Sequence, residues 1–333
     1  LDVRPFTTDT PNTDTITGGA GNDVVKYYDM ATLDDADTIN GNAGTDTIVL
    51  YAAGNAHSAT YTNISKIEAI TYALYTTTAA VTATLADANF VSLDSAPISA
   101  ATITSVVTID ASAENDSTVV ISGGTAGDTL TGTDTYLTLS GDTISGGNGA
   151  DILTGGVKAD IISGGAGIDT ITGGSGIDTL IGGAGNDIFN MDDVSDFIGL
   201  VTAEVIDGGA GVLDTILFDE NATTTVAASD LNNISGIERI SFGGTGANSL
   251  TLSNDVYTNN GSTSLTILDA DTAGATTVSA AGLSAANSVT YKNTAASSTT
   301  DSVTSGAGDD LFETFEDSLV AADVFAAGAG TDT

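Results

Sequence analysis

Residues 146–190 read GGNGADILT GGVKADIIS GGAGIDTIT GGSGIDTLI GGAGNDIFN, which are five nonapeptides without a break. Each follows the pattern G-G-x-G-x-D-x-u-x, in which u is a large apolar residue, except that Lys158 replaces the third glycine of the second copy. A flexible glycine-rich linker has no reason to place an apolar residue at every ninth position and an Asp two positions before it. The pattern therefore predicts a regular fold built from a nine-residue unit.

The fold that this unit predicts is a parallel β-roll, in which a tight six-residue turn alternates with a three-residue strand. Glycine is needed in the turn because several positions require positive φ or the close approach of another backbone, where a Cβ would clash. The apolar residue at position eight points inward and forms a thin core between two sheets. These residues are Leu153, Ile162, Ile171, Leu180 and Phe189. We therefore expect an all-β chain, a modular and elongated parallel β-roll or β-solenoid.

The Asp at position six of each nonapeptide is a candidate metal ligand. Its carboxylate is a hard oxygen donor, and turn carbonyls supply further oxygens, which suits Ca²⁺ with its about six to eight oxygen ligands. Variants of the turn recur at 18–50, 123–131, 137–145, 205–218 and 305–333. The predicted calcium site residues are Asp23, Asp46, Asp128, Asp142, Gly146, Asp151, Gly155, Asp160, Gly164, Gly167, Asp169, Gly173, Gly176, Asp178, Gly182, Gly185, Asp187, Asp214, Asp310 and Asp332.

Turns that are two repeats apart should stack, because two nonapeptides make one full coil. We therefore expect Asp151, Asp169 and Asp187 along one edge of the roll. Asp160 and Asp178 should lie along the other edge, with Asp142 beneath them in a weaker first turn. The Lys158 turn should bind metal less well than its neighbours, because it places a positive charge and a Cβ where the pattern has glycine.

Composition limits the possible partners and the compartment. The chain has 333 residues, a formal charge of −38 and no cysteine. Repulsion excludes nucleic acid as a partner. Self-repulsion opposes a compact state unless calcium relieves it, so folding should be coupled to metal binding outside the cell, where calcium is abundant. No run of about 18 apolar residues is present, so no membrane span is expected.

A longer repeat divides the chain. A composite of calcium turn, spacer and second turn begins at residues 18, 182 and 305. We expect solenoid modules at 1–136 and 191–304, the contiguous roll at 137–190, and the start of a third module at 305–333. An N-I-S-x-I-E block follows the first two composites, ending at Glu68 and Glu238. These glutamates are either further calcium ligands or exposed strand residues, and the second interpretation is favoured.

At residues 146–190, and more loosely at 18–50, 205–218 and 305–312, the chain resembles the RTX (repeats in toxin) family. The resemblance implies export by type I secretion in an unfolded form and folding in external calcium. The Ala/Thr/Ser/Gly-rich composition and the scattered calcium turns look most like RTX surface-layer (S-layer) proteins of Gram-negative bacteria. The main alternative is an RTX adhesin or surface filament, and another is the non-catalytic RTX domain of a secreted enzyme.

Enzyme signatures are missing from the sequence. RTX metalloproteases need H-E-x-x-H, whereas this chain has one histidine, His57, which we expect in a solvated loop. The G-x-S-x-G pentapeptide of lipases does not occur. We therefore expect no catalytic residues. The expected partner is a second copy of the chain, joined in a two-dimensional lattice by calcium bridges, with cell-surface polysaccharide as a further candidate. Two interpretations stay open for Asp34, Asp35, Asp37, Asp192, Asp193 and Asp196, which are either such bridging groups or solvated loop charges.

Overall fold

The structure is a computed structural model. It describes residues 2–3, 13–27, 37–52, 57–60, 63–74, 80–84, 96–114, 118–134, 140–191, 204–219, 223–271, 273–294, 299–314, 320 and 322–333. The chain divides into two compact units, Leu1–Asp178 and Thr179–Thr333. This division falls inside the predicted roll at 137–190, and the four predicted domains stay predictions.

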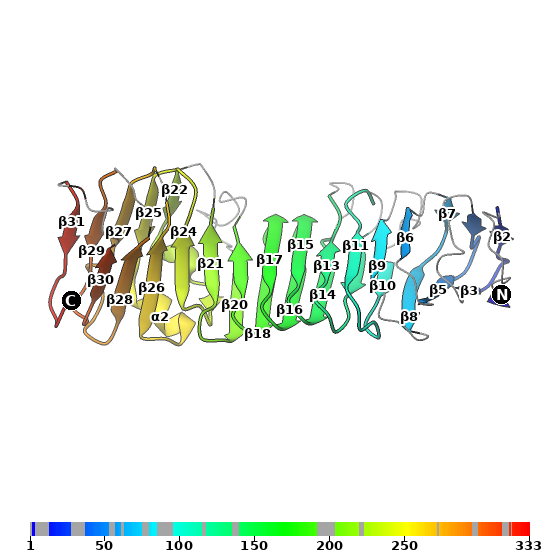
Figure 1. Ribbon diagram of the computed structural model, residues 1–333, viewed down its shortest axis with the longest axis horizontal. Helices are drawn as coiled ribbons and strands as arrows, with labels where there is room; N and C mark the ends of the chain where they lie inside the picture. Colours follow the sequence, from blue (N-terminus) through cyan, green and yellow to red (C-terminus); the bar gives the residue numbers. More distant parts are fainter. Residues whose placement is uncertain are drawn as a thin grey trace. The chain divides into compact units, whose positions relative to one another are not determined.

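The first unit is a parallel β-solenoid whose coils contribute strands to facing sheets (Figure 1). One sheet has the order β1 (Asp2–Val3), β3 (Val24–Tyr27), β5 (Thr47–Ala52), β8 (Ala69–Leu74), β10 (Ala96–Ser99), β12 (Val119–Ser122), β14 (Thr143–Asn148) and β16 (Ile161–Ala166). A second has the order β6 (His57–Thr60), β9 (Val81–Thr84), β11 (Val107–Asp110), β13 (Thr129–Thr131), β15 (Ile152–Val157) and β17 (Thr170–Ser175). A small third sheet holds β2 (Thr15–Thr17), β4 (Thr38–Asn40) and β7 (Ile64–Ser65).

The second unit repeats this architecture. One sheet holds β18 (Thr179–Ala184), β20 (Val205–Ala210) and β23 (Ile234–Ser235). A second holds β19 (Ile188–Asn190), β21 (Thr215–Phe218), β24 (Arg239–Phe242), β26 (Ser264–Asp269), β28 (Ser288–Asn293) and β30 (Leu311–Thr314). A third holds β22 (Thr224–Val226), β25 (Asn248–Thr251), β27 (Thr276–Ser279), β29 (Ser302–Thr304) and β31 (Val324–Ala326). A 3₁₀ helix, η2 (Ala228–Leu231), and an α-helix, α2 (Asn254–Asn260), were not expected from the sequence. Helix α2 is followed by the capping residue Gly261, whose φ of 70° is the left-handed conformation that often terminates a helix.

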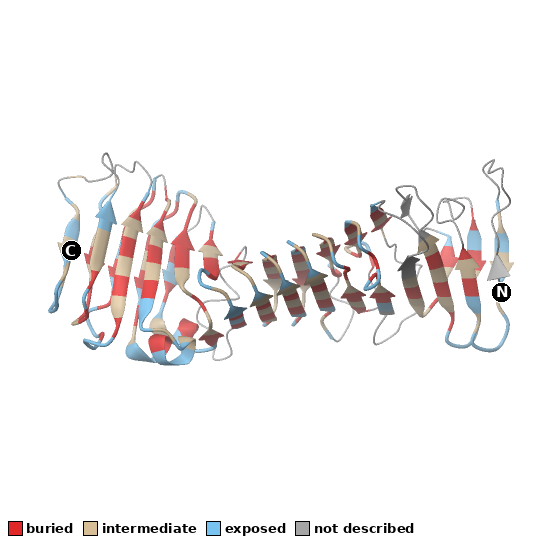
Figure 2. Ribbon diagram, turned by 60° about the horizontal axis from the view of Figure 1, so that its bottom comes forward, coloured by how far each residue is buried: buried red, intermediate tan, exposed pale blue. Residues whose placement is uncertain are grey.

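The core of each unit consists of buried apolar side chains stacked from strand to strand. The position-eight residue of all five nonapeptides is buried, as the sequence predicts. In the first unit, Leu130 pairs in register with Leu153, and Leu153 with Ile171. Buried residues alternate with more exposed ones along such strands, as Figure 2 shows. The thin aliphatic core therefore comes from the period-two alternation of side chains in stacked strands.

The strands of the roll are longer than predicted. Strands β14 to β18 each span six residues and include the first two glycines of the following turn. Gly147 pairs with Gly165, and Gly156 with Gly174, in the neighbouring coils. The prediction of three-residue strands is wrong because it treats the glycines only as turn residues. Their backbones continue the parallel ladder before the chain reverses.

Replacing Leu153 with Ala tests this core. Leu153 is 0% exposed, whereas its neighbour Ile152 is 53% exposed. We expect Leu153→Ala to lower the free energy of unfolding by about 2–5 kcal/mol, because it leaves a cavity between two packed strands. The matched control Ile152→Ala should cost less than about 1 kcal/mol. Urea unfolding in millimolar calcium measures both, and equal losses would contradict the assigned faces of β15.

The described residues contain no helix that is both long and apolar enough to cross a membrane.

Candidate metal centre

A ladder of carboxylates runs along the turns of each unit. The backbone N–H of an Asp at the end of one turn donates a hydrogen bond to a carboxylate oxygen of the equivalent Asp in the next coil. In the first unit, Asp142 donates to Asp160 at 2.6 Å, and Asp160 donates to Asp178 at 2.7 Å. In the second unit, Asp187 donates to Asp214 at 2.7 Å. Each of these aspartates thus uses one oxygen to tie two coils together.

The stacking predicted from the repeat is confirmed inside the first unit. Asp151 donates to Asp169 at 2.8 Å, and Asp142 lies in the ladder beneath Asp160 as expected. Asp128 extends the edge that holds Asp151 and Asp169, because its N–H donates to Asp151 at 2.7 Å. Asp187 belongs to the second unit, so its expected place above Asp169 stays a prediction.

The second carboxylate oxygen of several ladder residues points into its own turn. The Oδ2 atoms of Asp46, Asp151, Asp214 and Asp310 are buried and have no hydrogen-bond partner among the described residues. A Cβ on Gly146, the first glycine of its turn, would clash with Asp151 Oδ2 and crowd the carbonyl oxygen of Gly164 in the next coil. Bare carboxylate oxygens and carbonyl oxygens thus converge where only glycine fits. These donors suit calcium, which would satisfy buried oxygens that are otherwise costly.

The remaining predicted site residues are either glycines of the calcium turns or aspartates of the ladder. Gly155, Gly164, Gly173 and Gly182 are first glycines, and Gly155, Gly173 and Gly182 lie against the Asp of their own turn. Gly167, Gly176 and Gly185 are third glycines and have positive φ. Asp332 accepts the N–H of Asp310 at 3.0 Å. In the turn that ends at Asp214 one extra residue is accommodated by Val212, which is 80% exposed, and Asp214 keeps its place in the ladder.

In three predicted site residues, Asp142, Asp128 and Asp23, the second carboxylate oxygen accepts a hydrogen bond from the protein. Asp142 Oδ2 accepts hydrogen bonds from Thr133 N and Thr133 Oγ1, and Asp142 Oδ1 accepts one from Val119 N. Asp128 Oδ2 accepts from Gly124 N. Asp23 Oδ2 accepts from Gly19 N in a more exposed turn. These first turns are closed by protein donors, which gives a physical reason for weak metal binding there.

Lys158 occupies a strained backbone position. Its φ is 90°, a region that a residue with a Cβ rarely adopts and that glycine takes in the equivalent third positions of the neighbouring turns. The reduced metal affinity expected for this turn stays a prediction.

Sequence reasoning missed part of the ladder. Asp37 accepts from Asp14 N at 2.8 Å, Asp301 from Thr276 N at 2.9 Å, and Asp323 from Asp301 N at 2.9 Å. Each stands two residues before a strand residue that points inward, but outside a complete glycine turn. The triplet D-x-u without glycine is the signal that could have found them.

Three interpretations need correction. Glu68 and Glu238 are partly buried ladder members that accept the N–H of Asp46 and Asp214, so they are not exposed strand residues. Asp37 is buried and does not serve as a surface bridging group. His57 begins strand β6 and does not lie in a loop. The other candidate bridging groups, Asp34, Asp35, Asp192, Asp193 and Asp196, lie outside the described residues.

Burial makes these carboxylates hard to ionise without calcium. Burial raises the pKa of Asp151 to about 7; a hydrogen bond from the Asp128 backbone opposes the rise, and the charges of Asp169 and Asp128 add to it. Burial also raises the pKa of Asp269 to about 6 against a hydrogen bond from Tyr291. The pKa is likewise raised, chiefly by burial, for Asp128, Asp142, Asp169, Asp214 and Asp301.

Acid should therefore partly replace calcium. A carboxyl whose pKa is higher in the folded than in the unfolded state stabilises the fold at low pH, and this stability is lost as pH rises through the folded pKa. For calcium-free protein we expect the β circular dichroism signal to strengthen as pH falls from about 8 to 5, and to gain nothing further from these groups below about 4. In millimolar calcium the dependence should weaken, because metal competes with protons. A calcium-free signal that is flat or weakens toward pH 5 would contradict this account.

No group of three or more His, Cys, Asp or Glu side chains among the described residues is close enough to hold a metal ion by itself. The turns instead offer one carboxylate each, together with backbone carbonyls.

A family model for the RTX calcium-binding nonapeptide repeat matches the sequence four times, at residues 10–26, 31–52, 138–171 and 163–198. Neither the curated proteins nor the solved structures gave a match. The chain therefore carries RTX calcium-binding repeats, and these form a parallel β-solenoid.

Proposed function

We propose that the protein is a non-enzymatic structural component of a cell surface, secreted by the type I route and assembled into a calcium-dependent S-layer lattice. RTX repeats are typical of extracellular proteins exported in this way. The observation that carries the proposal is the distribution of the calcium ladders. They occur near both ends of the described residues of each unit, from Asp23 to Asp178 in the first and from Asp187 to Asp332 in the second, which supports a structural role for calcium in both units.

Surface charge supports lattice contacts through metal ions. The net charge of the chain is −38, and exposed carboxylates outside the ladder remain on the surface. Examples are Asp134, Asp207, Asp219, Asp255 and Asp309. Two such surfaces repel each other unless divalent cations lie between them. Calcium would thus build each unit and also join neighbouring molecules, with cell-surface polysaccharide as the proposed anchor.

Electron microscopy with a calcium titration tests the lattice. Purified full-length protein should form ordered two-dimensional sheets in millimolar calcium and disperse on chelation. Magnesium at the same concentration is the control for simple charge screening, and it should not produce sheets. Strictly monomeric protein at high concentration in calcium would overturn the lattice and favour an adhesin or surface filament.

A further inference from the structure

The calcium ladder of each unit meets the same short block. In the first unit Asp23 donates to Asp46, and Asp46 donates to Oε2 of Glu68. In the second unit Asp187 donates to Asp214, and Asp214 donates to Oε2 of Glu238 at 2.8 Å. Both glutamates end an N-I-S-x-I-E block, residues 63–68 and 233–238. A Glu thus takes the ladder position that an Asp holds in every nonapeptide pair described above.

The backbone of the two blocks is also the same. The Asp46 carbonyl accepts the N–H groups of Glu68 and Ala69, and the Asp214 carbonyl accepts those of Glu238 and Arg239. The residue two positions before each Glu, Lys66 or Gly236, has positive φ, at 55° and 63°. Two independent copies therefore share one geometry, which makes a chance arrangement improbable.

The x residue of the block replaces the first glycine of a calcium turn. In the array, a Cβ on Gly146 would crowd the carbonyl oxygen of Gly164, the first glycine of the next coil. In the first block the carbonyl oxygen of Lys66 takes this place against Gly41. In the second block the carbonyl oxygen of Gly236 takes it against Gly208. Both halves of a turn, its first carbonyl and its carboxylate, are therefore present in each block.

The block is shorter than a calcium turn, and Glu makes up the difference. In the array the Asp stands five positions after the first glycine, as Asp169 does after Gly164, but Glu238 stands only two positions after Gly236. The additional methylene of Glu lets its carboxylate reach the same N–H from this tighter path. This accounts for Glu at both blocks where the repeat uses Asp.

A second observation points to a ligand at these positions. Oδ2 of Asp46 and Oδ2 of Asp214 are buried without a hydrogen-bond partner among the described residues, although the other oxygen of each belongs to the ladder. Asp214 is 0% exposed and Asp46 is 1% exposed. A bare buried carboxylate oxygen is costly, and a cation removes that cost.

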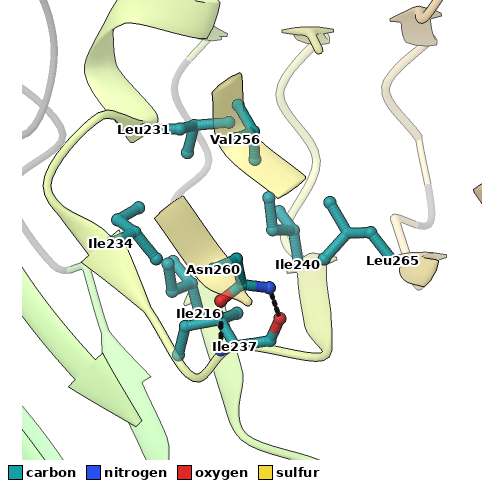
Figure 3. Close-up of a pocket in the computed structure, with 8 residues that line it drawn as sticks. All are labelled: Ile216, Leu231, Ile234, Ile237, Ile240, Val256, Asn260 and Leu265. Carbon is teal, nitrogen blue, oxygen red and sulfur yellow. Dashed lines mark hydrogen bonds between the residues drawn. The ribbon is translucent and has the colours of Figure 1, made fainter. Parts of the chain in front are cut away.

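The second block is closed on its outer side. Figure 3 shows the Asn260 carboxamide of helix α2 bonded to both backbone groups of Ile237, accepting from its N–H and donating to its carbonyl. Leu231, Ile234 and Val256 line the same small apolar pocket as Asn260 and Ile237 (Figure 3). A side chain of helix α2 thus satisfies both backbone groups of the residue before Glu238.

We propose that the N-I-S-x-I-E block is an abbreviated turn that closes a calcium column. Glu68 and the Lys66 carbonyl would complete a terminal calcium site with Asp46. Glu238 and the Gly236 carbonyl would complete one with Asp214. The block would fix where these two runs of bound calcium end. The coil that directly follows each block would then carry no calcium in this column. Ladder carboxylates recur further along, at Asp128 in the first unit and Asp310 in the second.

Calcium stoichiometry of Glu68→Gln and Glu238→Gln tests the proposal. Gln keeps a carbonyl oxygen for the ladder N–H but removes the carboxylate charge, so a purely structural role would be preserved. Equilibrium dialysis should show one bound calcium fewer in each variant, or at least tenfold weaker binding at one site. The matched control is Glu313→Gln, whose side chain is 49% exposed and pairs with Lys292, and it should bind as many ions as the parent. Unchanged calcium binding in both block variants would overturn the proposal.

A measurement on the unaltered protein covers the case in which a variant does not fold. Anomalous scattering from crystals grown in calcium should locate an ion between Asp214 and Glu238, and another between Asp46 and Glu68. Calcium in the nonapeptide turns together with ordered density that lacks an ion at both blocks would also overturn the proposal.

Discussion

Removing calcium is expected to convert the protein from a β-solenoid to a largely disordered chain. In the folded state, buried carboxylates such as Asp151 and Asp214 carry an oxygen without a hydrogen-bond partner among the described residues, and the chain has a net charge of −38. One ion at a hundred times its dissociation constant contributes about 2.7 kcal/mol, so several sites together exceed the about 5–15 kcal/mol of a typical domain. Circular dichroism in EGTA should show loss of the β signal, and millimolar calcium should restore it.

Magnesium at equal concentration provides the control for this experiment. It prefers strict octahedral geometry and keeps its waters, so it should restore little of the β signal. A β spectrum that survives exhaustive chelation at neutral pH would show that the aliphatic core alone holds the fold.

Replacing Asp151 with Asn should remove calcium from the middle of the roll. Asn keeps an oxygen to accept the N–H of Asp128 but places a neutral amide where the carboxylate Oδ2 has no hydrogen-bond partner among the described residues. We expect at least one bound ion to be lost or weakened at least tenfold, which is about 1.4 kcal/mol. Calorimetric calcium titration of the full chain measures the change.

Asp142→Asn is the matched control. Both oxygens of Asp142 accept protein hydrogen bonds, from Val119 and Thr133, so this substitution should destabilise the chain while leaving the number of bound ions unchanged. Equal loss of calcium from the two variants would contradict the structural role assigned to the Asp142 carboxylate and the metal-binding role assigned to the Asp151 carboxylate.

The nine-residue repeat was sufficient to predict the solenoid, its inward residues and its stacking. A buried column such as Leu130, Leu153 and Ile171 follows from an apolar residue that recurs in fixed register, and parallel coils leave one way to align it. The pairing of Asp160 with Asp178 follows from the same period. These features are local and periodic, so the chain specifies them without reference to distant residues.

What the sequence did not reveal depends on contacts between coils of unequal length. Asp37 and Asp301 join the ladder without a glycine turn, because the N–H that they accept comes from a coil more than 20 residues away. Glu238 accepts the ladder N–H of Asp214 beside the point where the Gly236 carbonyl approaches Gly208 of the neighbouring coil, and this juxtaposition is visible only in the fold.

The sequence by itself determined that this protein is a calcium-repeat β-solenoid, because glycine, Asp and an apolar residue recur at spacings that only stacked coils can use. The tertiary structure alone decided which carboxylate oxygens stay bare. That depends on whether a donor from another segment hydrogen-bonds to these oxygens, as the N–H of Thr133 does to Asp142. A hydrogen bond across coils is set by three-dimensional proximity, which the one-dimensional period does not encode where spacers differ in length.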